Sequence, residues 1–251
     1  MIAIATAPEA GVSRTVLPNG LTVLSEFVPG VRSVAIGAWV RSGSMHEHGD
    51  QVGIAHMLEH MVFKGTTKYG AKALALSLEV LGGSLDAYTT REHTSYQARV
   101  LDEHLSEASD VLFELCFQPL LRDEDLRLER KVILEEIAMV DDTPDDVIFE
   151  LHAARMYPGH AYGHAILGTP ATVKRISAAD LRAWHERAYH PPQIVLAAAG
   201  NVTHERLLDV LDATGWATRA RGVSEWLAPP PPPEAIMREY THVKRKDIAQ
   251  T

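Results

Sequence analysis

The spacing of apolar residues changes along the chain, and the first half is mostly strand-like. Alternating apolar and β-branched residues predict two strands around a hairpin turn at residues 18–20 and a longer strand over residues 31–43. Residues 84–90 and 94–101 predict two more strands. A sixth strand is predicted much later, at "QIVLAAAG", residues 193–200.

Helical spacing dominates the remainder. The apolar stretch at residues 53–66 predicts a helix buried on every side, and residues 71–81 predict a second helix that ends at a Gly-Gly pair. Further helices are predicted over residues 103–117, 122–140, 145–156, 178–188 and 203–213. Strands first, helices next and a returning strand indicate an α+β fold, with an about six-stranded, mainly antiparallel sheet packed against several helices.

The character of the chain changes after Trp216. A proline run lies within residues 228–235 and predicts a semi-rigid linker. Too few residues follow it to make a domain. We therefore expect one domain over residues 1–220, with residues 221–251 forming an interdomain linker and the start of a second half that is missing.

Three ionisable residues interrupt the apolar stretch "GIAHMLEHMVFKGT": His56, Glu59 and His60. Positions i, i+3 and i+4 share one face of a helix, so the three side chains project together. Burying even a neutral polar group without a partner costs roughly 2–7 kcal/mol. Two imidazoles one turn apart form half of a zinc site, and the carboxylate is placed to act as a base. A hydrogen-bonded polar cluster is the alternative, since the short motif alone also occurs without metal.

A zinc site with two histidines needs a third ligand, and helical spacing indicates where it lies. Glu129 and Glu136 are two turns apart within an apolar stripe, whereas Glu135 lies about 100° round the helix on the more solvated side. Glu136 and Glu129 are therefore the candidates for a ligand and for a supporting carboxylate. The stripe comprises Leu126, Val132, Ile133, Ile137 and Val140.

The order His-x-x-Glu-His is the inverzincin signature. With "ERKVILEEIAMV" following it, the chain resembles the pitrilysin–insulysin family of zinc peptidases, and is most similar to the branch with the mitochondrial processing peptidase β subunit and its bacterial relatives. The resemblance covers nearly the whole chain and includes "LPNGLTVLSE", "GGSLDAYTTREHTSYQARVL", "DDTPDDVIFELH", "ILGTPATVKRI" and "HPPQIVLAAAGNV".

The resemblance implies a role for each of these polar residues. His56, His60 and Glu136 would bind one zinc ion per chain. Glu59 would be the general base that deprotonates the zinc-bound water. Glu129 would support the catalytic site by helping to orient it. The implied activity is zinc-dependent hydrolysis of extended or unfolded peptides, with basic, presequence-like peptides as one expected substrate group.

The resemblance also implies a substrate strand at residues 84–90, to which the peptide adds as an extra β-strand. Asp86, Ala87 and Tyr88 would then face the peptide. Family members usually have Asn at the position of Asp86. The acid either favours a basic substrate residue or is a simple turn-proximal charge, and both interpretations stay open.

Family members usually have two homologous halves, or pair with a second subunit, and the second half supplies an Arg/Tyr pair that helps bind substrate and stabilise the oxyanion. We expect this chain to lack that half, because the predicted linker lies close to its end. We therefore expect weak or no activity from the chain alone, and a partner half, a partner subunit, or homo- or hetero-oligomers. The alternative function is a non-catalytic peptide-binding or scaffold subunit of a two-chain, processing-peptidase-like assembly.

Composition restricts the possible partners and the cellular location of the protein. A formal charge of −9 argues against a nucleic-acid partner. The lone Cys116 is expected to be a small core residue. No apolar run approaches the roughly 18–20 residues that span a bilayer, and the N-terminus lacks the pattern of a signal peptide. We expect a soluble, cytoplasmic protein without a membrane partner. His46, Glu47 and His48 are expected to lie in a solvated loop.

Overall fold

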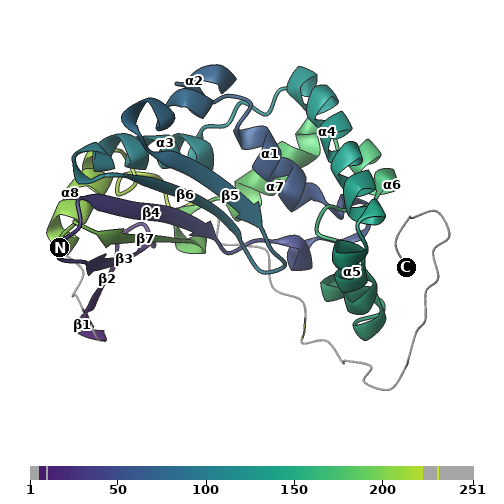
Figure 1. Cartoon of the computed structure of the whole chain (residues 1–251), viewed down its shortest axis with the longest axis horizontal. Coiled ribbons are helices and arrows are strands. Elements are labelled where there is room, and N and C mark those ends of the chain that lie inside the picture. The colour runs from purple at the N-terminus through teal and green to yellow at the C-terminus, as the bar shows by residue number, and fades with distance from the viewer. Residues whose placement is uncertain (1–5, 10, 223–230, 232–251) are drawn as a thin grey trace.

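The computed structural model describes every residue except 1–5, 10, 223–230 and 232–251 (Figure 1). Its strands are β1 (Thr6–Glu9), β2 (Val12–Val16), β3 (Thr22–Phe27), β4 (Ser33–Val40), β5 (Ser84–Thr89), β6 (Thr94–Leu101) and β7 (Ile194–Gly200). They form one sheet in the order β1-β2-β3-β7-β4-β6-β5. Strands β3 and β7 run parallel, and the other neighbours are antiparallel. The expected α+β class is confirmed, with β1 as a seventh strand in the described part of the chain.

The described helices are α1 (Ile54–Val62), α2 (Ala71–Leu76), α3 (Leu105–Phe117), α4 (Asp123–Asp142), α5 (Pro144–Met156), α6 (Pro170–Arg175), α7 (Ala178–Ala188) and α8 (His204–Ala213). Short 3-10 turns occupy Ser44–His46, Gly49–Gln51, Glu79–Leu81, Asp102–His104, Ala161–Gly163 and Pro191–Gln193. Figure 1 shows α1, α4, α5 and α6 gathered at one end of the sheet, while α3 and α8 lie along it.

The core lies between one face of the sheet and the helices. In β4 the alternate residues Val34, Ile36, Ala38 and Val40 are all buried, as a strand with one face on the core requires. Helix α3 packs against β4 and β6, and α8 packs against β3. Cys116 of α3 is fully buried, so its expected core position is confirmed.

Over much of the opposite face of the sheet, the described residues form no second layer. Ala35, Arg99 and Ala199 point to this side and are exposed. A hollow of about 320 Å³ lies on it and is lined by residues of five strands, including Trp39 and Gln97.

Helix α1 is held firmly at its start. Gly53 precedes it with a φ of 95°, in the left-handed region that favours glycine. A Cβ atom there would lie 2.7 Å from the carbonyl oxygen of Leu167, so the chain also has no room for a side chain. Beyond this turn, Met57 and Met61 are fully buried. The helix therefore has little freedom to shift along its axis or rotate.

Two elements were not expected from the sequence. Strand β1 pairs irregularly with β2, with a register shift between Thr6 and Glu9. Helix α6 has six residues and starts with a capping box in which the Thr169 hydroxyl accepts from the backbone N–H of Thr172. Such a short helix gives almost no hydrophobic period, although its Thr-Pro start is a recognisable signal.

Residues 223–230 and 232–251, which include most of the proline-rich segment, lie outside the described residues. The expected domain boundary near residue 220 therefore stays a prediction. Within the described part, the buried Trp216 still belongs to the core of this domain. No helix described here has the length and apolar character needed to cross a membrane. The expected cytoplasmic location also stays a prediction.

Candidate metal centre

Helix α1 presents the two predicted histidines on one face. The imidazole rings of His56 and His60 lie with their centroids 4.6 Å apart. His56 is buried, whereas His60 and Glu59, nearer the C-terminal end of the helix, are half-buried. The i, i+3, i+4 spacing thus places all three side chains on one side of α1, as the sequence predicted.

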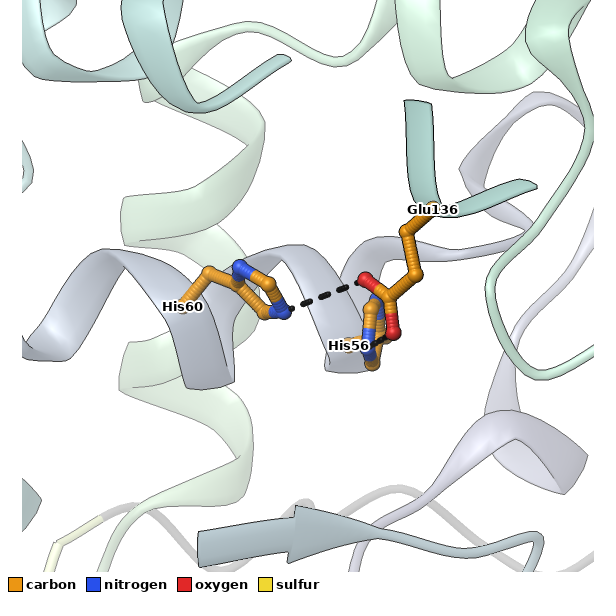
Figure 2. A group of neighbouring side chains, drawn as sticks. All are labelled: His56, His60 and Glu136. Atoms are coloured by element: carbon orange, nitrogen blue, oxygen red, sulfur yellow. Dashed lines mark ion pairs between the residues drawn. The ribbon is translucent and has the colours of Figure 1, made fainter. Parts of the chain in front are cut away.

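The third predicted ligand comes from α4, which crosses α1. Glu136 Oε1 lies 3.8 Å from His56 Nε2, and Glu136 Oε2 lies 3.6 Å from His60 Nε2. Figure 2 shows the Glu136 carboxylate pointing from α4 towards both rings. Its side chain is 39% exposed, so one side of the group remains accessible. The structure therefore brings together residues that are 80 positions apart in the sequence.

The three side chains fit a zinc ion. One nitrogen from each histidine and one carboxylate oxygen all lie within 4.8 Å of one another. Ligand atoms about 2.0–2.2 Å from a tetrahedral zinc are roughly 3.4 Å from each other, close to the separations from Glu136. In the part of the chain that the structure describes, this is the one such group of three. The donor set, two imidazoles and a carboxylate, is typical of catalytic zinc.

Glu129 supports the group from behind. The Nδ1–H of His60 donates to Glu129 Oε1 at 2.8 Å, and Lys64 Nζ lies 2.6 Å from the other carboxylate oxygen. This bond fixes the tautomer of His60, so that Nε2 is left as the electron-pair donor facing Glu136. Glu129 is only 5% exposed, and its position is set by the buried side of α4.

Electrostatics differ between the two rings. Burial, with a smaller effect of His60, lowers the pKa of His56 to about 3, so this ring is neutral at neutral pH. Burial also opposes a charge on His60, but the hydrogen bond to Glu129 and the nearby Glu136 carboxylate raise its pKa overall. Burial opposes ionisation of Glu129 too, yet His60 and Lys64 lower its pKa.

Glu59 lies beside the group but does not belong to it. Its Oε2 accepts a hydrogen bond from the Thr89 hydroxyl at 2.5 Å. Burial raises the pKa of Glu59, and the Thr89 bond counteracts part of that rise. A carboxylate with a raised pKa next to a metal group is suited to accepting a proton.

The apolar stripe of α4 is narrower than predicted. Leu126, Ile133 and Ile137 are buried, but Val132 is 50% exposed, so its placement in the stripe was wrong. Val132 lies a full 100° from Ile133, and that angle carries it off the core side. Glu135 is exposed, as expected.

Sequence reasoning missed Glu47. The loop of His46, Glu47 and His48 was expected to be solvated, yet the first two are buried and only His48 is exposed. Glu47 accepts from the backbone N–H groups of Gly53, at 2.7 Å, and Ala55, at 2.8 Å. It thus caps α1 at the end where the helix dipole favours an anion. Burial raises its pKa to about 8, against the effect of these two bonds.

The predicted substrate strand is the last strand of the sheet. Strand β5 pairs with β6 alone among the described strands, which leaves its outer edge free. Asp86 and Tyr88 are exposed, whereas Ala87 is half-buried. The three residues predicted to face a peptide therefore do not share a face, because successive side chains on a strand alternate.

The chain is similar to known proteins of one family. The sequence pattern of the insulinase family (peptidase family M16) matches residues 22–170, and that of the peptidase M16 inactive domain matches residues 175–251. An uncharacterised zinc protease of Mycobacterium leprae is 41% identical over 80% of this chain and 45% of its own. A probable mitochondrial-processing peptidase subunit beta of Arabidopsis thaliana is 38% identical over 82% of this chain and 38% of its own.

A solved protease structure from Helicobacter pylori superposes with a TM-score of 0.83 at 22% identity, covering 91% of this chain and 54% of the other. That likeness supports the fold. The chain spans about half the length, or less, of the two relatives above. The insulinase match covers more than half of this chain and contains every predicted site residue. The chain therefore belongs to the insulinase family, peptidase family M16.

Proposed function

We propose that this chain is the catalytic half of a zinc-dependent endopeptidase. The observation that carries the proposal is the convergence of His56, His60 and Glu136 on one point, with Glu59 beside them and outside the donor group. Family membership and relatives named as zinc proteases support a metallopeptidase. One zinc ion per chain follows from one group of three donors.

The proposed roles follow from the geometry. Bound by the three donors, zinc would supply a Lewis acid and lower the pKa of a bound water to about 7. Glu59 takes up the proton of the attacking water and delivers it to the leaving amine. Glu129 holds His60 in the required tautomer. His56 needs no deprotonation, because its lowered pKa keeps the ring neutral.

The proposed substrates are extended or unfolded peptides. A free strand edge binds an extended peptide through main-chain hydrogen bonds, and the side chains then set specificity. Strand β5 offers such an edge, and it packs against α1. The exposed Asp86 on β5 and the net charge of −9 both favour basic, presequence-like peptides.

The proposed partner is a homologous second half, on the same chain or on another subunit. The chain spans about half the length of its relatives, and no described element packs over one face of its sheet. Exposed apolar side chains also lie on α4 and α5: Val132 is 50%, Met139 is 70% and Phe149 is 72% exposed. Apolar surface of this kind favours association.

The second candidate is a non-catalytic peptide-binding or scaffold subunit. The match of residues 175–251 to the inactive domain of the family favours it. That match, however, contains none of the proposed zinc or base residues. A chain that keeps the full donor group and the base is better explained as the catalytic partner.

A crystal structure with a trapped peptide tests the proposal. We expect a zinc-loaded Glu59→Gln variant to bind an extended basic peptide by main-chain pairing along β5. The peptide should pass close to the zinc, because β5 and α1 are in contact. A peptide bound elsewhere, or zinc bound away from His56 and His60, would contradict the proposed function.

A further inference from the structure

A hydrogen bond joins the outermost strand of the sheet to the proposed base. Thr89, the last residue of β5, donates its hydroxyl hydrogen to Oε2 of Glu59 on α1 at 2.5 Å. The two elements also pack against each other. The bond therefore fixes the Glu59 carboxylate relative to the strand edge.

The Thr89 hydroxyl is itself well anchored. Thr89 pairs with Thr94 of β6 in the antiparallel register, and the two hydroxyl oxygens lie 3.4 Å apart. Thr94 is 1% exposed and donates to the carbonyl oxygen of Ser42 at 3.1 Å. A threonine also has few side-chain rotamers, because it is branched at Cβ. The donor to Glu59 is thus held by the sheet and does not depend on a flexible side chain.

Strand β5 has two different sides. Leu85, Ala87 and Thr89 are half-buried, whereas the residues between them are exposed. Because β5 packs against α1, the half-buried side is the one that faces the helix. The backbone edge of the same strand is free. One strand therefore offers a template for an extended peptide and, through Thr89, a hydrogen bond to the base.

We propose that Thr89 is a positioning residue that aims the Glu59 carboxylate at a peptide aligned on β5. This inference rests on the proposed function. The Thr89 bond occupies Oε2 and leaves Oε1 of Glu59 as the oxygen that exchanges a proton. The peptide and the base are then both positioned by the backbone of β5. The sheet therefore sets the distance from the scissile bond to the Glu59 carboxylate. The rival explanation is that the bond merely ties α1 to the sheet.

Two substitutions separate these explanations. Thr89→Val keeps the shape and β-branching of the side chain but removes the donor, whereas Thr89→Ser keeps the donor. Each variant is made in the protein with its second half present and loaded with zinc. We expect Thr89→Val to lower kcat by up to about 100-fold, the effect of a misplaced catalytic group, with KM little changed. Thr89→Ser should recover most of kcat, and both variants should retain one zinc ion.

Crystal structures of the metal-free parent and of both variants give a readout that does not depend on activity. We expect the Glu59 carboxylate to rotate away in Thr89→Val and to stay in place in Thr89→Ser. Unchanged kcat in Thr89→Val, an unmoved carboxylate, or equal losses in both variants would overturn the inference. A parent that binds zinc but cleaves no peptide would instead count against the proposed function, and the carboxylate position would still decide whether Thr89 holds Glu59.

Discussion

Loaded with zinc but alone, residues 1–251 should cleave an extended peptide at least about 100- to 1,000-fold more slowly than the same chain supplied with a homologous second half. The loss of even one preorganised donor at the transition state costs about that much. The family resemblance implies that an Arg/Tyr pair from the second half acts in this way. A second half would also supply the other wall that positions the peptide.

The measurement compares initial rates for one unstructured basic peptide with and without the second half, at equal zinc occupancy. Size-exclusion chromatography with light scattering must verify that the chain alone is a monomer, because its bare sheet face and exposed Met139 favour association. Full activity of the verified monomer would show that residues 1–251 contain everything needed, and would contradict the half-site proposal.

Removal of one zinc ligand should have the second large effect. We expect His56→Ala, His60→Ala and Glu136→Gln each to weaken zinc binding by more than the roughly 10- to 100-fold that follows loss of a supporting residue. Glu129→Gln should fall within that smaller range, because it removes only the hydrogen bond that orients His60. Glu59→Gln should retain the metal.

Competition with a chromophoric chelator measures these affinities on one scale. Glu135→Gln is the matched control, because Glu135 is the exposed neighbour of Glu136 on the same helix. This substitution removes the same charge as Glu136→Gln. Zinc held as tightly by Glu136→Gln as by Glu135→Gln would show that the third ligand has been wrongly assigned.

Helical spacing was enough to predict most of the candidate metal centre. His56 and His60 share a face because they are four apart, and helical spacing nominated Glu129 and Glu136 together, from which the family resemblance singled out Glu136 as the ligand. The structure places these three together. The sequence alone did not determine that α1 and α4 cross at these positions. That assignment also needed the resemblance to a known family.

Residues that act through tertiary contacts were not predictable in this way. Glu47 lies in a loop with the polar composition of a solvated segment, and only the packing around Gly53 buries its carboxylate. Nothing in the local sequence distinguishes Thr89 from other threonines in strands. Its hydrogen bond to Glu59 depends on how β5 packs against α1. Neither contact leaves a periodic signal in the sequence.

The fold, too, was predictable where local sequence signals are strong and not where elements are short. The hairpin at residues 18–20 and the strand at residues 94–101 were predicted from local turn chemistry and alternation, and both are present as β2–β3 and β6. Strand β1 and helix α6 were missed because each is short. Val132 was misplaced because apolar residues also occur on protein surfaces, and the residue type alone does not show which of them are exposed.

The most direct test of the central claim is peptide cleavage by Glu59→Gln and by the parent, each with its second half and each verified to hold one zinc ion. A general base contributes about 100- to 10,000-fold to such a reaction, so the variant should lose at least about 100-fold in kcat while its zinc content stays the same. Cleavage by Glu59→Gln at the parental rate, or no cleavage by the zinc-loaded parent, would contradict the account.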